Sequence, residues 1–296
     1  MRGKIVLASL ILSLSGVAAS AQNPAASAPI YKDVYCSGTI TNESVPQDSY
    51  VITGEGSNYK ITFWDGDYVY LNKGASQGVK VGDEFSVIRP VVDPTEVEWS
   101  KWQFAIIRKL GTWWEDEGRV RVVVAQPDTS VAQVEHSCSY VQRGDILLPF
   151  HERPTPPLKS EANFDRFAPF SGKATAMVMI GKNFQVELGT NDVFFVNLGS
   201  QQGVRVGDYF RIFRYTGTEH ELAYETKRAA FDNDKEATVY GRIYGFGSSP
   251  EKWKWDNTPR EVIGEGIVLR TGTNSATVLT TFSLREFFVG DYVELE

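Results

Sequence analysis

The residues whose types could do chemistry begin with the run WWEDE at 113–117, where three acids follow two tryptophans. Glycoside hydrolases work with a pair of carboxylates that flank the scissile bond. Successive residues of an extended chain point to opposite faces, so adjacent acids do not make such a pair. We therefore expect this run to be a solvated turn before a strand that begins at Gly118.

Metal and nucleophile patterns are weak elsewhere in the chain. The run FDNDKE at 231–236 suggests a calcium loop. However, such a loop needs Gly at its sixth position and Glu at its twelfth, where Ala237 and Ile243 stand. The three histidines, His136, His151 and His220, show neither metal-ligand spacing nor a nucleophile motif. The sequence therefore predicts no cofactor, no metal site and no catalytic residue.

Tryptophan pairs are the strongest candidates for binding. Trp253 and Trp255 flank one lysine, so both rings would share one face of a strand. Trp113 and Trp114 form a second pair, and tryptophan carries much of the binding energy at protein interfaces. We predict an aromatic binding surface at these four residues. The alternative is that such aromatics cap the two halves of the chain as small satellite cores.

These candidates belong to a sequence that repeats itself. Residues 67–89 and 192–214 align without a gap and share eleven residues. The shared pairs are Asp67/Asp192, Asn72/Asn197, Gly74/Gly199, Gln77/Gln202, Gly78/Gly203, Val79/Val204, Val81/Val206, Gly82/Gly207, Asp83/Asp208, Phe85/Phe210 and Arg89/Arg214. Such a match indicates two copies of one small fold.

The centre of the repeat predicts a compact turn between two strands. Closely spaced glycines disfavour a helix, and Gly-Asp pairs precede short apolar runs along the whole chain. We expect Val79 and Val81 to fill the core beneath this turn. The residues assigned to the structural turn motif are Gly74, Gly78, Gly82, Asp83, Gly199, Gly203, Gly207 and Asp208.

Several short strands in each repeat predict an all-β fold of two tandem small SH3-like β-barrels. We expect one short helical insert in the first barrel, because Asp93-Pro94 and Gly111 bound a segment with apolar residues at helical spacing. We assign 1–21 to a signal peptide, 22–32 to a disordered spacer, 33–150 to the first repeat, 151–168 to a Pro-rich linker and 169–296 to the second repeat.

The pattern Asn-x-Gly-x-x-x-Gly-Val-x-x-Gly-Asp-x-Phe occurs at 72–85 and again at 197–210. It resembles the C-terminal SH3-like domain of the bacterial flagellar assembly protein T family. A similar turn occurs in the β-domains of rod-shape-determining periplasmic scaffolds, and the whole chain resembles exported bacterial proteins. Both families are envelope assembly proteins and not enzymes. The resemblance implies a fold and a compartment. The doubled unit, its inserts and the lack of counterparts to the flagellar family's other domains leave a flagellar role undecided.

The N-terminus has the charged, apolar and small-residue segments of a secretory signal peptide, with cleavage near Ala21. We expect an exported protein, periplasmic or extracellular, without a transmembrane segment. In such a compartment Cys36 and Cys138 are predicted to form a disulfide that closes the first barrel. The formal net charge of −7, without a basic run, argues against nucleic acid as a partner.

The predicted function is an exported, non-catalytic module for envelope assembly or protein interaction. Its partner would be an envelope protein or peptidoglycan, and a homo-oligomer stays open. Two alternatives also stay open. A glycan- or peptidoglycan-binding protein would show exposed coplanar aromatics in a groove. An enzyme would bring two acids, or a nucleophile and a base, together in a pocket.

Overall fold

The computed structural model describes residues 28–91, 103–159, 164–214 and 260–296, and its elements are mostly strands. The first repeat contains α1 (Tyr31–Tyr35), β1 (Thr39–Thr41), β2 (Val51–Gly54), β3 (Thr62–Phe63), β4 (Tyr68–Leu71), the 3-10 turn η1 (Ala75–Gln77), β5 (Glu84–Pro90), α2 (Gln103–Leu110), β6 (Thr112–Ala125), β7 (Ser130–Ser137), β8 (Val141–Gln142) and β9 (Ile146–Pro149). The second contains β10 (Thr175–Gly181), η2 (Lys182–Phe184), β11 (Glu187–Leu188), β12 (Val193–Val196), η3 (Ser200–Gln202), β13 (Tyr209–Arg214), β14 (Glu261–Thr271), β15 (Ala276–Ser283), β16 (Phe287–Phe288) and β17 (Tyr292–Leu295).

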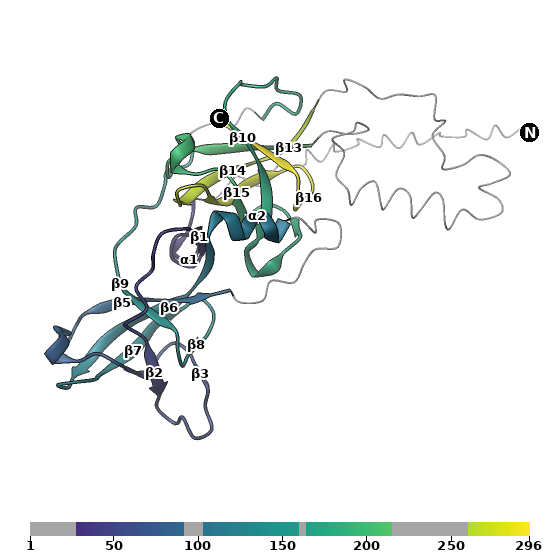
Figure 1. Ribbon diagram of the computed structural model, residues 1–296. Coiled ribbons are helices and arrows are strands. Elements are labelled where there is room, and N and C mark those ends of the chain that lie inside the picture. Colours follow the sequence, from purple (N-terminus) through teal and green to yellow (C-terminus); the bar gives the residue numbers. More distant parts are fainter. Residues whose placement is uncertain (1–27, 92–102, 160–163, 215–259) are drawn as a thin grey trace, which may run out of the picture.

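Both repeats arrange their strands in the same order. The second repeat is a closed antiparallel barrel with the order β10-β12-β15-β14-β13-β17, and the first is a sheet with the order β2-β4-β7-β6-β5-β9 (Figure 1). The first sheet is not closed by a strand ladder. Backbone hydrogen bonds from Val51 to Asp145 (2.9 Å) and from Leu147 to Ser49 (2.8 Å) nevertheless join its outer strands. Of the predicted all-β fold, the predominance of strands is thus confirmed.

The shared turn follows the same backbone path in both repeats. Gly78 and Gly203 end the turns η1 and η3 with φ angles of 91° and 88°, a left-handed conformation that glycine adopts without strain. A Cβ atom at Gly74 would lie 2.2 Å from the carbonyl oxygen of Gln126, and Gly199 is confined in the same way. The backbone therefore requires glycine at these shared positions.

Six aspartates that precede strands make one recurring turn. In each turn Asp Oδ2 accepts a hydrogen bond of 2.7 or 2.8 Å from the backbone N–H three residues earlier. The residue before the aspartate always has positive φ, as a type II turn requires, and it is glycine except at Asn191. The six are Asp67, Asp83, Asp145, Asp192, Asp208 and Asp291.

The two valines of the turn lie in different environments. Val79 is 8% exposed and packs into the first core, and Val204 occupies the same place in the second. Val81 is 66% exposed, and Val206 also points to solvent. The expectation that Val81 fills the core is wrong. It stands at the outer corner of the Asp83 turn, where a side chain projects away from the sheet.

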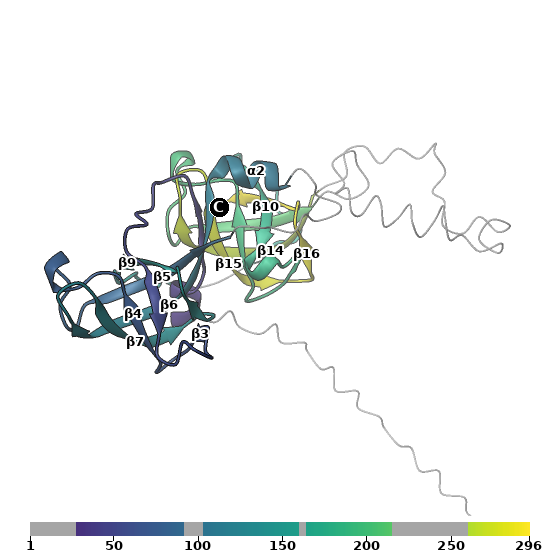
Figure 2. The same ribbon diagram turned by 60° about the horizontal axis from the view of Figure 1, so that its bottom comes forward.

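The two repeats share a buried core of their own. Phe104 and Ile107 of α2, with Ile40 and Trp113, pack on the second repeat at Met179, Ile180, Phe195 and Val289. Figure 2 shows α2, an element of the first repeat, lying against the second barrel. The described part of the predicted helical insert is therefore a helix, and its role is to join the repeats.

The predicted disulfide is present, with the Cα atoms of Cys36 and Cys138 5.3 Å apart. It joins the residue after α1 to the residue after β7, so it fastens the N-terminal helix to the sheet and does not close the barrel. Helix α1 begins at Tyr31, inside the predicted disordered spacer, and Tyr31 stacks on Tyr35 with ring centroids 4.5 Å apart.

Candidate functional site

The four tryptophans that were predicted to bind a partner fall into two groups. Trp253 and Trp255 lie outside the described residues, as does the FDNDKE run. Trp113 and Trp114 are only 3% and 5% exposed, and the Trp113 ring meets Phe195 at a centroid distance of 5.3 Å. Trp113 and Trp114 are core residues and not part of an exposed surface, because β6 has protein on both of its faces here.

The three acids that follow these tryptophans lie within β6, and two of them are buried. Glu115 is opposite Arg89 of β5, and Glu117 also approaches Arg89, whereas Asp116 contacts Arg270 on the other side. This is the alternation of an extended strand. The expectation of a solvated turn is wrong, because arginines from distant parts of the chain surround these acids.

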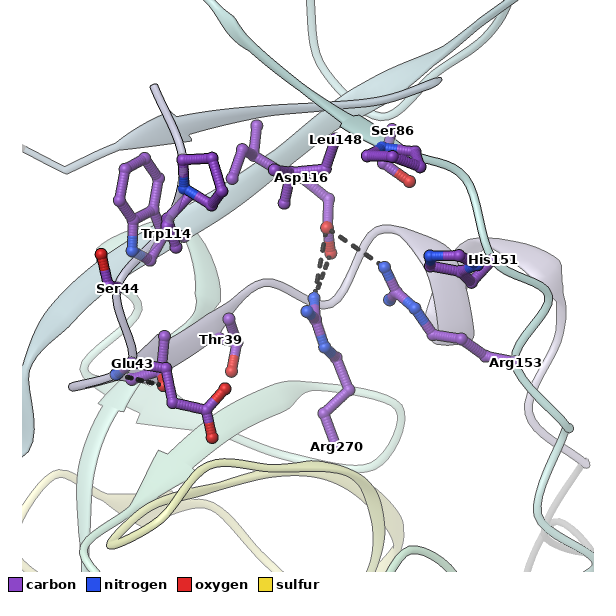
Figure 3. A pocket seen from close by; sticks show the side chains of 15 residues that line it. Thr39, Glu43, Ser44, Ser86, Trp114, Asp116, Leu148, His151, Arg153 and Arg270 are labelled. Carbon is purple, nitrogen blue, oxygen red and sulfur yellow. Dashed lines mark hydrogen bonds and ion pairs between the residues drawn. The ribbon is translucent and has the colours of Figure 1, made fainter. Parts of the chain in front are cut away.

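Asp116 lies at the junction of the two repeats and lines a pocket of about 420 Å³, which we call the junction pocket (Figure 3). Arg270 of the second repeat donates to both carboxylate oxygens of Asp116, at 3.0 and 3.2 Å. Arg153 of the linker approaches the same carboxylate at 3.7 Å, and Gly38 N–H donates to it at 2.8 Å. Burial and the charge of Arg270 lower the pKa of Arg153. One carboxylate thus connects both repeats and the linker.

The charged lining of the junction pocket is balanced. Asp116 and Glu43 contribute two carboxylates, and Arg153 and Arg270 contribute two guanidinium groups. A balanced lining selects neither an anion nor a cation. His151 also lines the pocket, but no hydrogen bond links it to a carboxylate or hydroxyl within the described part of the chain. Among the described residues that line the pocket, no nucleophile–base contact of a catalytic pair is present, and the ion pairs link the two repeats.

Glu117 is a buried acid without a counterpart in the second repeat. Gly118 faces Val87, just as Gly264 faces Ile212, and a bulge precedes each glycine. That bulge holds Glu117 in the first repeat and Ile263 in the second, and both side chains are 1% exposed. The fold therefore accepts an apolar residue at this position, and the acid is not required by the backbone.

The surroundings of Glu117 favour its protonated form. Arg89 lies 3.1 Å from Glu117 Oε1, without hydrogen-bond geometry, while it makes a two-point contact to Asp145 at 2.7 and 2.9 Å. One guanidinium group cannot neutralise both carboxylates. Burial, opposed by Arg89 and assisted by the charge of Asp145, raises the pKa of Glu117 from its ordinary 4.5 to about 8.

The outer faces of the two repeats differ in what covers them. In the second repeat, outward side chains of β10, β12 and their neighbours are buried or partly buried beneath α2, Ile40 and Trp113. This covered face consists of Met177, Met179, Ile180, Val186, Phe195 and Val289. The corresponding positions in the first repeat follow from the strand register and from an equivalent hydrogen bond in each repeat between a backbone N–H and an asparagine side chain. This open face consists of Tyr50, Ile52, Thr53, Ile61, Tyr70 and Arg143.

The open face exposes large apolar side chains. Tyr50, Ile61 and Tyr70 are 41%, 79% and 36% exposed, whereas Phe195, the counterpart of Tyr70, is fully buried. Trp64, in the loop after β3, is also half exposed. Strands β2 and β3 lie at the end of the first repeat that points away from the second (Figure 1). A group of exposed aromatic side chains of this kind makes the open face the candidate interaction surface.

The same comparison can be made on the side of the barrels that the linker covers in the second repeat. Ile267 and Leu279 point outward from the second barrel and are buried where Leu158 of the linker packs beside them. Their counterparts in the first repeat are Arg121 and Gln133. The other two buried members of this group, Val193 and Leu269, correspond to Tyr68 and Val123, which are 37% and 36% exposed. This side of the first repeat therefore mixes polar and exposed apolar residues, and Arg121 shows only that such a position accepts a polar side chain.

A search of protein-family models found no match to this chain, and a comparison with curated proteins found no significant relative. Within the described residues no group of three or more His, Cys, Asp or Glu side chains is placed to hold a metal ion. The same part of the chain contains no helix long and apolar enough to cross a membrane.

Proposed function

We propose that this chain is an exported, non-catalytic interaction module for envelope assembly, in which two SH3-like units form a rigid support. The observation that carries the proposal is the open face. Its tyrosines are exposed, whereas the second repeat buries the counterpart of Tyr70 fully and the counterpart of Tyr50 partly against protein. Tyrosine is among the residues that contribute most to binding at protein interfaces.

The remaining shared residues support this assignment, because their side chains act within the fold. Asn72 and Asn197 accept backbone hydrogen bonds of 2.7 Å, and Gln77 and Gln202 accept bonds from the glycines of the turn. Arg89 forms the buried pair with Asp145 described above. These residues stabilise the scaffold, and the differences between the repeats are left to provide recognition.

The proposal is tested by capture from solubilised envelope, with a peptidoglycan pelleting assay beside it. We expect the wild-type chain to retain an envelope protein, and the double variant Tyr50→Ala/Tyr70→Ala to lose it. Phe167→Ala is the matched control, since this ring in the linker lies outside the open face and is 65% exposed. Circular dichroism should be unchanged in all three. Equal capture by the double variant would refute the proposal.

Binding of a glycan has less support. The exposed Trp64 ring is paired with Tyr140 at 6.2 Å, and the two rings are inclined by 51°. Sugar rings stack on flat aromatic platforms, which this tilted pair does not provide. Pelleting with peptidoglycan that depends on Trp64 would reverse this preference.

A further inference from the structure

Within the described part of one molecule, the first repeat covers a face of the second, but the second repeat does not cover the corresponding face of the first. The first repeat contributes α2, Ile40 and Trp113, and the second contributes its covered face. The first repeat carries the same face, formed by the same strands, and nothing in the described residues covers it. Units that associate head to tail always leave one such face unused at the end of the row, where another copy can bind.

We propose that the open face of one molecule binds the second repeat of another copy of this chain, in the orientation that relates the two repeats within a molecule. This inference rests on the proposed function, which makes the open face a protein interface, and it names the partner. The contact is heterologous, because different surfaces of the two copies meet. It therefore permits a row of molecules and not only a dimer.

The order of segments along the chain supports this orientation. In the first repeat, the segment between β5 and β6 contains α2, which lies on the covered face of the next repeat. In the second repeat, residues 215–259 occupy the corresponding position between β13 and β14. They lie outside the described residues, and their sequence contains Trp253 and Trp255. At the same point of its sequence the second repeat thus has a segment that, in the proposed arrangement, would meet the open face of a second copy.

The chemistry of the open face fits a reversible contact. The permanently covered face is formed by Met, Ile, Val and Phe. At the corresponding positions the open face has Tyr50 for Met177, Tyr70 for Phe195 and Arg143 for Val289, and so remains compatible with water. Enrichment in tyrosine and arginine is typical of interfaces between proteins that also exist apart.

Sedimentation equilibrium of the purified protein tests the inference with two variants. Tyr50→Ala/Tyr70→Arg removes the open face, and Trp253→Ala/Trp255→Ala alters the segment from the second repeat. We expect the wild-type mass to rise with concentration beyond that of a dimer. Each variant alone should associate at least tenfold more weakly, since loss of aromatic anchors has effects of this size. An equimolar mixture of both should form heterodimers, because each retains one intact surface.

Other results overturn the inference in distinguishable ways. If the tryptophan variant still dimerises while the open-face variant does not, the contact is symmetric and the head-to-tail arrangement is wrong. If wild type stays monomeric at all concentrations, self-association is wrong. In that case the loss of a captured envelope protein by the open-face variant would still uphold the proposed function. If capture is unaffected as well, both proposals fail. Phe167→Ala should behave as wild type throughout.

Discussion

Replacing the buried acid Glu117 by glutamine should stabilise the protein, and the gain should depend on pH. Glutamine keeps the shape of the side chain and has no charge to lose. In the folded state the pKa of Glu117 is raised to about 8, whereas the unfolded chain has the ordinary value of 4.5. A raised pKa means that the folded protein binds this proton more tightly, so the wild type loses stability as the pH rises from 4.5 through 8.

The size of the effect follows from the shift. Each pKa unit corresponds to about 1.4 kcal/mol, so the cost of burying Glu117 is near zero at pH 4.5 and roughly 3 kcal/mol at pH 7. Above pH 8 it reaches a ceiling of roughly 5 kcal/mol, where the folded protein must hold the ionised form. Glu117→Gln should remove this cost. Its advantage over wild type should therefore increase with pH and become constant above pH 8.

Urea unfolding at a series of pH values between 4.5 and 9 measures this difference directly. Glu286→Gln is the control, because the same chemical change is made at an exposed position. It should give no advantage that increases with pH. Glu117→Ile, which copies Ile263 of the second repeat, should also be at least as stable as wild type at pH 8. A gain for Glu117→Gln that is the same at every pH would refute the reasoning.

Two further predictions concern the links within the fold. Cys36→Ser/Cys138→Ser should lower the free energy of unfolding by about 4 kcal/mol, because the disulfide spans 102 residues. Reductant should lower the urea midpoint of the wild type but not of this variant. Equal urea midpoints for wild type and variant would contradict this prediction. Asp116→Asn should lower the free energy of unfolding by about 2 kcal/mol, because it leaves the guanidinium groups of Arg153 and Arg270 facing each other. In a double-mutant cycle, adding Arg270→Gln should restore part of this stability. Additive losses of stability would show that Asp116 and Arg270 are not coupled.

The turns of the backbone could be predicted from the sequence, because each turn depends on the chemistry of residues that are neighbours in the chain. Each Gly-Asp pair specifies its own turn, through a positive φ and a carboxylate that accepts a nearby N–H. The disulfide was predicted from the expected oxidising compartment and the presence of two cysteines. These features need no knowledge of what lies across the molecule. Strand β6 was expected to begin at Gly118 and instead begins at Thr112, because pairing with β1 and β5 extends it through an acidic run.

The environment of individual side chains could not be predicted in the same way. Trp113 looked like a binding residue because its type is common at interfaces, but α2 and the second repeat bury it. The open face was missed because its members come from separate strands, and only their covered counterparts reveal it. One signal for Glu117 was available. Cys138 and Leu284 each lie six residues before a Gly-Asp pair, and counting back equally from both pairs this acid with Ile263.

Because the fold is duplicated, each residue of one repeat can be compared with the residue at the same position of the other. A difference between the two shows what the fold allows but does not require. The bulge accommodates Ile263 in one repeat, so the fold does not explain why Glu117 stands in the other. In the same way, Arg121 shows that an uncovered outer position of the first repeat can be polar, so the fold does not explain Tyr70. Residues kept equal in both repeats maintain the scaffold. Residues that are costly or exposed and occur in only one repeat need a cause outside the single barrel. For the open face we propose that this cause is a protein partner.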